Sequence, residues 1–286
     1  DVTKDNTIGL SGYVSDNVSV SSVQIYDGTT VLAGGATIAN GSWNYVTPTL
    51  SEGVHTFKAI AVDSSGNSNF SNSISLTVDI TPDAAPAIFN LSAADDTGAI
   101  TTDNITKKIN GLRIHGTGVN GSSVQLYTWV DANNNRVIEN SELIALGSAT
   151  RVAVTGAFSI DVNLVEGVNN IVAKQTDTAG NVSAASSVLQ ITVDTLPPDK
   201  PTTREINTYS NTTIQITSNL TDTIKVYVDN ILTPATYNST EATLTFQNPL
   251  KDGDNTITYT LTDAAGNESV PSDSMNIHVI RKVTID

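Results

Sequence analysis

Residues 255–267 read NTITYTLTDAAGN, and this stretch decides the fold of the chain. Its first half alternates polar with apolar side chains, a period-two pattern typical of a β-strand with one buried face. Its second half is a turn sequence, in which Asp263 starts the turn, Gly266 permits a positive φ and Asn267 satisfies the main chain. The stretch therefore predicts a strand that ends in a tight polar turn.

This strand and turn belong to a unit that recurs along the chain. The Asp-x-x-Gly-Asn turn occurs at residues 63–67, 177–181 and 263–267. An alternating strand that ends in tyrosine precedes each turn, at Tyr26, Tyr127 and Tyr227. A fixed order of the same signals indicates a tandem repeat. We place the three units at residues 1–79, 84–194 and 199–286, with proline-bearing junctions between them because proline ends a strand and stiffens its exit.

Each unit has the strand signals of a small β-sandwich. About seven short strands bounded by Gly, Asn and Asp turns fit into each unit, and no amphipathic stretch of helical length interrupts them. Of the 29 acidic residues 22 are aspartate, which favours turns and metal loops over helix interiors. The sequence therefore predicts an all-β protein of three immunoglobulin-like domains that lack the Cys–Trp–Cys core.

The composition excludes several classes of protein. The 286-residue chain has a net charge of −15, which works against binding the phosphates of nucleic acid. It has no apolar run long enough for a transmembrane helix, so no membrane insertion is expected. It has no cysteine, which excludes a disulfide scaffold and thiolate metal sites.

The repeat resembles the bacterial Ig-like repeats of giant adhesins that type I systems secrete. The residues that carry the resemblance are the Val-x-Ile-Tyr type of strand, Gly-x-Trp or Gly-x-Phe, the Asp-x-x-Gly-Asn turn and the Val-Asp-x-Thr-Pro type of exit. The resemblance implies a cysteine-free elongated rod of stacked sandwiches, secreted or on the bacterial surface, that presents a distal binding tip to host cells. It also implies calcium at the domain junctions. The third unit departs from the pattern, since it lacks a recognisable Asp-x-Thr-Pro exit.

The middle unit carries an insertion of about 13 residues after its tyrosine, and residues 129–143 contain a candidate calcium loop. On a 12-residue calcium loop, side-chain oxygens fall at Asp131, Asn133 and Asn135, a main-chain oxygen at Val137 and a bidentate carboxylate at Glu142. Arg136 stands where such loops have glycine for the sharp turn. The alternative is an Asn-rich hairpin that binds no metal.

Aspartates at the junctions form the second candidate metal site. The loop between the last two strands of an Ig-like sandwich lies at the domain's N-terminal end, which places Asp177 and Asp263 beside the linkers that enter the second and third domains. Ionised carboxylates that lie close together need a cation. We therefore expect calcium at a first junction formed by Asp79, Asp95, Asp96, Asp103 and Asp177, and at a sparser second junction formed by Asp194, Asp199 and Asp263.

One alternative to these junction sites stays open, and one further half-site is expected. Each Asp-x-x-Gly-Asn is also explained as a plain turn with no metal. At the N-terminal end we expect Asp63 to stand with Asp1 and Asp5 as a half-site.

The sequence favours no catalytic function. Its three histidines, His55, His115 and His278, are isolated, and we expect them at solvent-facing strand positions. It contains no zinc pair of histidines, no nucleophile elbow and no phosphate loop. Trp43 is expected in the core, with a sugar-stacking platform as the alternative, and Trp129 is expected to cover the hairpin of the calcium loop.

These observations lead to a structural hypothesis. The chain is expected to be a monomeric stalk segment of a secreted or surface adhesin, in which calcium ions lock neighbouring Ig-like repeats into a rod. One alternative is a module that itself binds a receptor or host-cell surface glycans. Another is an accessory region of a secreted glycosidase.

Overall fold

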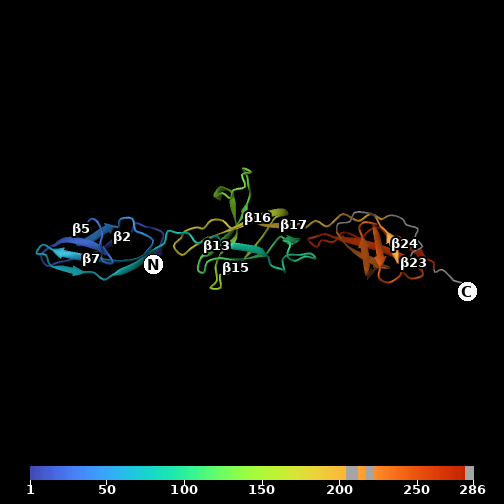
Figure 1. Ribbon diagram of the computed structural model, residues 1–286, viewed down its shortest axis with the longest axis horizontal. Helices are drawn as coiled ribbons and strands as arrows, with labels where there is room; N and C mark the ends of the chain where they lie inside the picture. The colour runs from blue at the N-terminus through green and yellow to red at the C-terminus, as the bar shows by residue number, and fades with distance from the viewer. Residues whose placement is uncertain (204–211, 217–221, 281–286) are drawn as a thin grey trace.

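The computed structural model describes residues 1–203, 212–216 and 222–280 of the chain. Three β-domains follow one another along a single long axis (Figure 1). Apart from one 3-10 turn at Asn140–Glu142, every regular element in these residues is a strand. The expected all-β fold with tandem Ig-like domains is therefore confirmed. None of the described residues form a helix that is long and apolar enough to cross a membrane.

Domain 1 packs a large sheet against a small one. The large sheet has the order β1-β9-β7-β3-β4, with β8 paired to β7, and the small sheet has the order β2-β6-β5. The strands are β1 (Val2–Thr3), β2 (Gly9–Tyr13), β3 (Val20–Asp27), β4 (Thr30–Val31), β5 (Thr37–Ala39), β6 (Ser42–Val46), β7 (Gly53–Asp63), β8 (Ser68–Phe70) and β9 (Ile74–Val78). The apolar residues of β3 and β7, among them Val23, Ile25 and Phe57, fill the space between the sheets.

Domain 2 has the same two layers, with three strands in its small sheet and five in its large one. The sheets have the orders β11-β17-β16-β13-β14 and β10-β12-β15. The strands are β10 (Ala87–Leu91), β11 (Ile105–Thr106), β12 (Leu112–Thr117), β13 (Ser123–Trp129), β14 (Leu143–Arg151), β15 (Ala157–Val162), β16 (Gly167–Thr176) and β17 (Leu189–Val193). Its core is the most complete of the three, since Leu112, Ile114, Leu126 and Ile171 have no exposed surface.

Domain 3 repeats the arrangement in the residues that the structure describes. Its sheets have the orders β20-β19-β23-β24 and β18-β22-β21. The strands are β18 (Thr213–Gln215), β19 (Thr223–Val228), β20 (Ile231–Thr233), β21 (Ala235–Asn238), β22 (Thr243–Phe246), β23 (Gly253–Thr262) and β24 (Met275–Val279). The last residues of the third sequence unit, 281–286, lie outside the described part of the chain.

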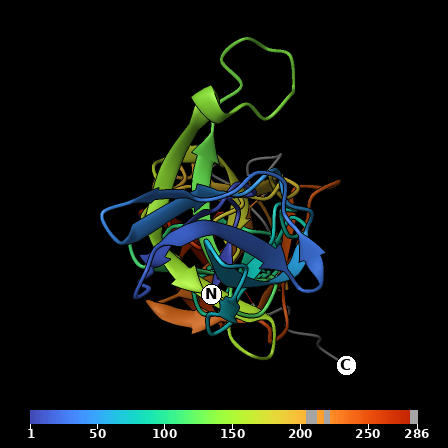
Figure 2. The ribbon, with the colours of Figure 1, turned by 90° about the vertical axis from the view of Figure 1, so that its left-hand side faces the viewer.

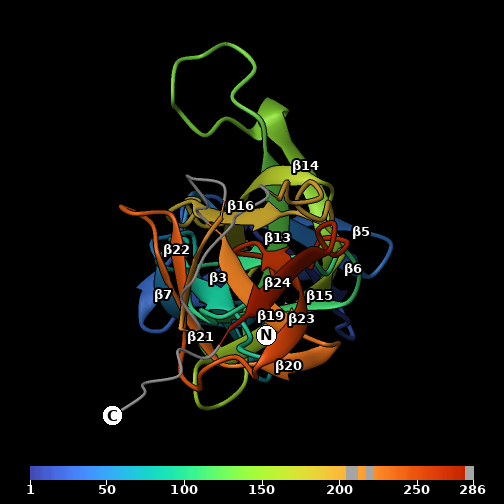
Figure 3. The same ribbon diagram turned by 90° about the vertical axis from the view of Figure 1, so that its right-hand side faces the viewer.

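The insertion in domain 2 forms a hairpin that leaves the rod sideways. β13 and β14 pair from Ser123↔Arg151 to Trp129↔Leu143, and residues 130–142 connect them. Seen along the long axis, this connection projects beyond the outline of all three domains (Figure 2 and Figure 3). Among the described residues, the loop is thus the part that reaches furthest from the axis.

One histidine is buried, which corrects the expectation that all three face solvent. His55 is 8% exposed, its Nδ1 lies 2.6 Å from Asp27 Oδ2, and its Nε2 lies 2.9 Å from the main-chain oxygen of Ser51. Asn169 and Asn255 take its place in domains 2 and 3 and also bond to the turn before the strand. The position faces inward because a polar group there is needed to satisfy the main chain of that turn.

Candidate functional site

The Asp-x-x-Gly-Asn turn is a self-contained hydrogen-bonded loop. In domain 1, Asp63 Oδ1 accepts the main-chain N–H groups of Ser65 and Asn67, and its Oδ2 accepts the Asn67 side-chain amide at 2.7 Å. The bond from the Asn67 side chain, with those from the main chain, lowers the pKa of Asp63. The geometry of this recurring turn is therefore explained by its own hydrogen bonds, without a metal ion.

In domains 2 and 3 the same loop contacts the preceding domain. At the first junction, between domains 1 and 2, the side-chain amide of Asn181 donates both to Asp177 Oδ2 at 2.9 Å and to the main-chain oxygen of Asp79 at 2.8 Å. Burial acts to raise the pKa of Asp177, but hydrogen bonds from Asn181 and the turn outweigh it and lower the pKa. Lys4 Nζ of domain 1 also donates to the main-chain oxygen of Gly180 at 3.1 Å.

The second junction, between domains 2 and 3, repeats these bonds in equivalent residues. The Asn267 side chain donates to Asp263 Oδ2 at 2.9 Å and to the main-chain oxygen of Asp194 at 2.7 Å. Lys107 Nζ donates to the main-chain oxygen of Gly266 at 2.6 Å. The expectation that Asp177 and Asp263 lie beside the linkers entering their domains is therefore confirmed.

The second junction has a further close contact. Thr97 Oγ1 donates to the main-chain oxygen of Ala265 at 2.5 Å. A Cβ atom on Gly98 would lie 2.0 Å from the main-chain oxygen of Ala264, and Gly98 has a φ of 103°. Only glycine fits both the conformation and the space, so domain 3 rests directly on the main chain of domain 2 at this point.

Each linker is also hydrogen-bonded to the domain that precedes it. Thr81 Oγ1 donates to Glu52 Oε2 at 2.5 Å, and Thr195 Oγ1 donates to Glu166 Oε2 at 2.7 Å. Both glutamates precede the glycine that opens the long strand β7 or β16. The threonine of each Asp-x-Thr-Pro or Asp-Thr exit therefore fixes the start of the linker on its own domain.

The structure corrects the grouping of aspartates at the first junction. Asp95, Asp96 and Asp103 lie at the opposite end of domain 2 from Asp79 and Asp177, because strand β10 first runs along the domain before the loop that carries them. The neighbouring Thr97 and Lys107 contact domain 3, which places the loop at the second junction.

The half-site expected for Asp63 with Asp1 and Asp5 is also wrong, because these residues lie at opposite ends of domain 1. β1 pairs in parallel with β9, so Asp1 and Asp5 lie at the first junction, whereas Asp63 lies at the far end of domain 1. The expectation assumed that the chain begins at the end where Asp63 stands. The position of β1 shows that residues 1–5 correspond instead to the segment of domain 2 around β11.

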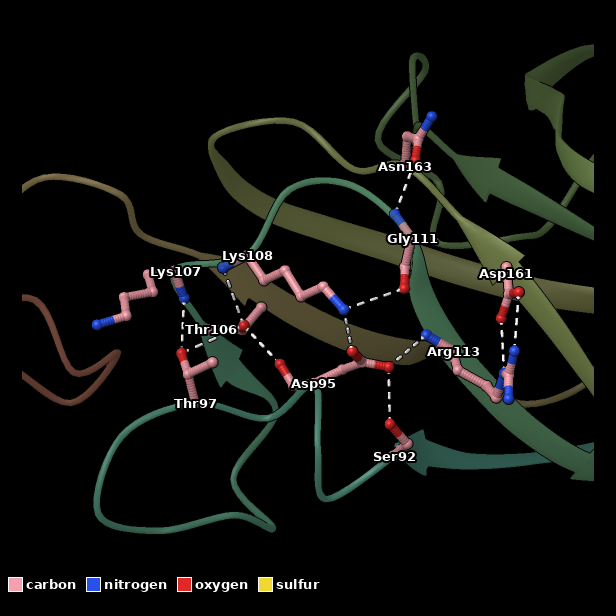
Figure 4. Close-up of polar contacts among 10 residues, drawn as sticks. All are labelled: Ser92, Asp95, Thr97, Thr106, Lys107, Lys108, Gly111, Arg113, Asp161 and Asn163. Carbon is pink, nitrogen blue, oxygen red and sulfur yellow. Dashed lines mark hydrogen bonds and ion pairs between the residues drawn. The ribbon is translucent and has the colours of Figure 1, made fainter.

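Asp95 is paired with a lysine. It is 6% exposed, forms an ion pair with Lys108 through Oδ1, and accepts the Ser92 hydroxyl and the Arg113 main-chain N–H through Oδ2 (Figure 4). Burial acts to raise its pKa, but these partners outweigh burial and lower it. Its charge is therefore compensated by Lys108. Arg113 makes a separate exposed ion pair with Asp161.

Asp96 has no such partner. It is 1% exposed, and although Oδ2 accepts the Asn104 main-chain N–H at 3.0 Å, Oδ1 is buried with no hydrogen-bond partner. Burial raises the pKa of Asp96, and the adjacent charge of Asp103 raises it further. A buried carboxylate with an orphaned oxygen beside a second carboxylate is an arrangement that a cation would satisfy.

The remaining junction aspartates are not gathered into a cluster. Asp194 Oδ1 accepts the main-chain N–H of Leu196, and Asp199 is exposed in the linker. Within residues 1–203, 212–216 and 222–280, no three His, Asp or Glu side chains lie close enough together to hold a metal ion. Any calcium there would need main-chain oxygens and water to complete its 6–8 ligands.

The projecting loop at residues 131–142 gathers several oxygens. Asp131 Oδ1 and Asn133 Oδ1 both lie 3.0 Å from the main-chain nitrogen of Asn135, so the two oxygens face one point. Asn135 Oδ1 in turn accepts the main-chain N–H of Val137 at 2.7 Å. Arg136 adopts a φ of 60°, the left-handed conformation that glycine supplies in other calcium loops, so the sharp turn forms despite its side chain.

Glu142 closes the base of this loop. It is 9% exposed, and its carboxylate accepts Trp129 Nε1 at 3.1 Å and the Ala132 main-chain N–H at 3.0 Å. Trp129 therefore covers the hairpin as expected. The donor set of hard carboxylate and amide oxygens fits calcium, with Asp131, Asn133 and Asn135 at one end and Glu142 at the other.

The interdomain role of the lysines was missed from the sequence. Lys4 and Lys107 each follow a short β-strand in the parallel pairs β1–β9 and β11–β17. The signal was present, since residues 2–4 read VTK and residues 105–107 read ITK.

The model of the family described as bacterial Ig-like domain matches residues 1–80 and 83–195. The chain belongs to the bacterial Ig-like domain family. The two matches correspond to domains 1 and 2, and domain 3 repeats their strand arrangement and junction contacts. No curated protein sequence matches the bacterial Ig-like chain.

Solved structures similar to these bacterial Ig-like domains are distant in sequence. The fibronectin(III)-like modules of Clostridium thermocellum CbhA are 19% identical, with 68% of this chain and 87% of that chain covered and a TM-score of 0.36. The FN1–FN3 domains of chicken CNTN1 are 11% identical, with 98% of this chain and 96% of that chain covered and a TM-score of 0.40. The family match is therefore the comparison that identifies the chain.

Proposed function

We propose that this chain is a stalk segment of a large secreted or surface adhesin, in which neighbouring Ig-like domains are locked end to end. The observation that carries the proposal is that Asn181 and Asn267 make the same bond to the residue that follows the last strand of the preceding domain. Each asparagine is itself fixed by the aspartate of its turn. A side chain held on both sides transmits the orientation of one domain to the next, as a stiff spacer needs.

The sequence pattern suggests the giant non-fimbrial adhesin of Salmonella as the individual protein nearest in kind. The comparisons reach the family alone, and they support the bacterial Ig-like part of the proposal. A secreted chain of this kind would present a distal binding site to host cells. Because it has no cysteine, no disulfide can stiffen it, and in this proposal the junction contacts and bound ions take that role.

We further propose two calcium sites. Asp131, Asn133, Asn135 and Glu142, with the main-chain oxygen of Val137, would hold one ion in the projecting loop. Asp96 and Asp103 would hold the other at the second junction, where the orphaned oxygen of Asp96 supports the assignment. Calcium would supply positive charge there and remove the repulsion between the two carboxylates. Asp79 and Asp177 lack such support at the first junction, since Asp177 is satisfied by its own turn.

Small-angle scattering of the chain with calcium and with chelator tests the stalk. We expect the profile of an extended rod in calcium, and a broader distribution of distances in chelator if the ion at Asp96 stiffens the second junction. A flexible chain in calcium would refute the stalk. An unchanged profile in chelator would remove calcium from the stiffening and leave the direct hydrogen bonds.

Equilibrium dialysis tests the ions separately. We expect two calcium ions per chain with affinities of roughly 10⁻⁴–10⁻³ M, typical of extracellular modules. Glu142→Gln and Asp103→Asn should each lose one ion and keep the other. Fewer than two ions on the unmodified chain would contradict the assignment of the missing site.

A further inference from the structure

A shallow hollow lies on domain 2 between the end of β14 and the strand β15. It has a volume of about 340 Å³ and is lined by His115, Thr150, Arg151, Ala157, Phe158 and Ser159. This size and the mixture of polar and apolar side chains are typical of sites for small ligands. In domain 1, by contrast, Trp43 is half-buried and packs against the core, so its expected core position is met in part.

The main chain brings β14 close enough to β15 to form the hollow. Gly147 has a φ of 68°, and a Cβ atom on it would lie 2.9 Å from the main-chain oxygen of Asp161. Glycine therefore lets β14 approach β15. A tight turn, in which the main-chain N–H of Ala153 donates to the oxygen of Ala157 at 3.0 Å, then leads the chain from β14 into β15. The end of β14 forms one wall of the hollow and β15 the other.

The outward face of β12 and β15 supplies an imidazole and a hydroxyl group. His115 lies opposite Ser159 in the register of the two strands, and the residues on either side of each are buried or belong to the opposite face. His115 therefore faces outward, as expected from the sequence. Two residues along the same strands, Arg113 forms its ion pair with Asp161 (Figure 4). The acidic neighbour on this face is thus already compensated.

The hollow keeps two basic side chains without an acidic partner. Among the described residues, neither Arg151 nor His115 forms a hydrogen bond or an ion pair through its side chain, and none of the residues that line the hollow is acidic. Other basic side chains of domain 2 have oxygen acceptors, namely Lys107, Lys108, Arg113 and Lys174. The chain has 29 acidic against 14 basic side chains, so acceptors are plentiful. The hollow is therefore a positively charged place in an acidic protein.

We propose that this hollow binds a carboxylate-bearing sugar, a uronic acid, at the end of a glycan chain. Arg151 takes the carboxylate by two parallel N–H···O bonds, the geometry in which a guanidinium recognises this group. His115 and Ser159 bond to the hydroxyl groups of the sugar ring, and Ala157 packs against its C–H groups. A neutral sugar leaves the guanidinium without its acceptor and binds more weakly. This binding depends neither on calcium nor on the stiffness of the junctions.

Methyl glucuronide and methyl glucoside are matched probes, because they differ only by a carboxylate in place of a hydroxymethyl group. Both are titrated into the whole chain, and amide chemical shifts are followed by NMR. We expect methyl glucuronide to shift the signals of residues 150–151 and 157–159 and to leave those of β24 in place. Methyl glucoside should bind about tenfold more weakly, because it lacks the charge-assisted hydrogen bonds.

Substitutions of exposed Arg151 test its role without disturbing the core. Arg151→Gln should lose the preference for methyl glucuronide, and Arg151→Lys should keep a part of it, because lysine retains the charge but not the two parallel bonds. Lys200→Gln removes one positive charge from domain 3 and should bind as the unmodified chain does. Equal affinity for the two sugars, shifts that lie outside the hollow, or an unchanged preference in Arg151→Gln would overturn the proposal.

Discussion

The side-chain amide of Asn181 donates a hydrogen bond of 2.8 Å to the main-chain oxygen of Asp79, across the boundary between two domains. Asp79 is the residue that follows the last strand of domain 1, and Asn181 ends the turn that domain 2 presents to it. Because the acceptor is a main-chain atom, the contact depends on the fold of domain 1 and hardly on the side chains of the linker. A repeat can use it at every junction.

Replacing Asn181 and Asn267 by alanine should make the rod flexible. Each substitution removes a bond between domains that contributes about 0.5–1.5 kcal/mol. We expect a wider range of interdomain orientations, measured by residual dipolar couplings or by scattering, with little change in the strands themselves.

Asn67→Ala is the matched control for this experiment. Asn67 makes the same bond to the aspartate of its turn, at 2.7 Å, but belongs to domain 1, whose turn contacts no preceding domain in the structure. Asn67→Ala should destabilise its own turn by a similar amount and leave the orientations between the domains unchanged. Equal flexibility in all three variants would show that the turn, and not the contact across the junction, sets the stiffness.

Gly98→Ala should loosen the second junction alone. The added methyl group would meet the main-chain oxygen of Ala264, and alanine is strained at a φ of 103°. We expect residual dipolar couplings to show increased motion between domains 2 and 3, while domains 1 and 2 keep their relative orientation. Gly66→Ala, in a turn with open space around it, controls for the strain of the substitution. An unaltered second junction would show that domain 3 does not rest on Gly98 in solution.

Asp95→Asn and Asp96→Asn should change stability in opposite directions in calcium-free buffer at neutral pH. Asp95→Asn removes the ion pair with Lys108, and we expect this loss to destabilise domain 2 by about 1–3 kcal/mol. Asp96→Asn removes a buried charge that has an orphaned oxygen, and should stabilise domain 2. Urea unfolding followed by signals of domain 2 measures both. A loss of stability on Asp96→Asn would mean that its charge has a partner.

Stability of domain 1 should fall as the pH rises above the usual pKa of histidine. The hydrogen bond to Asp27, followed by that to Ser51, raises the pKa of His55. A group whose pKa is raised in the folded state binds its proton more tightly there, so its contribution is complete below about pH 6.5 and is lost as the pH passes the folded pKa. Hydrogen exchange of β7 across this range measures the effect.

His55→Asn tests the cause of that pH dependence. Domains 2 and 3 carry asparagine at the matching position and keep the same turn. The variant should therefore fold and lose the dependence on pH in this range. If the dependence persists, another titrating group is responsible.

Trp129 should report calcium in the projecting loop. Its Nε1 donates to Glu142, so an ion that recruits this carboxylate should change the emission of the indole. Trp43→Phe, which copies the Phe158 of domain 2, leaves Trp129 as the single fluorophore. Glu142→Gln keeps an acceptor for the indole and should abolish the response to calcium. The same response in that variant would exclude Glu142 as a ligand.

The fold was predictable because its signals are local. Alternating strands such as residues 255–263 and the turns after them need no knowledge of distant residues, and repetition in three copies made the pattern clear. The position of the insertion after Tyr127 and the contact of Trp129 with the hairpin followed in the same way.

The grouping of the aspartates was not predictable from proximity in the sequence. Asp79 and Asp83 precede β10, and Asp95 follows it, but one strand is enough to carry the chain to the other end of the domain. Whether a carboxylate forms an ion pair with a lysine also depends on the course of the chain through the domain. Asp95 and Asp96 are neighbours in the chain, yet the first meets Lys108 and the second keeps an orphaned oxygen.

The parallel pairing of β11 with β17, and of β1 with β9, determines how the chain carries load. Tension drawn along a chain of such domains would pull β17 toward its end and β11 toward its beginning, so the two strands would slide past each other. The main-chain bonds that Thr192 and Asp194 donate to Asn104 and Thr106 lie across that direction and would have to break together. Shear of this kind resists force far better than opening bonds one after another, and domains 1 and 2 each place this clamp next to the junction with the following domain.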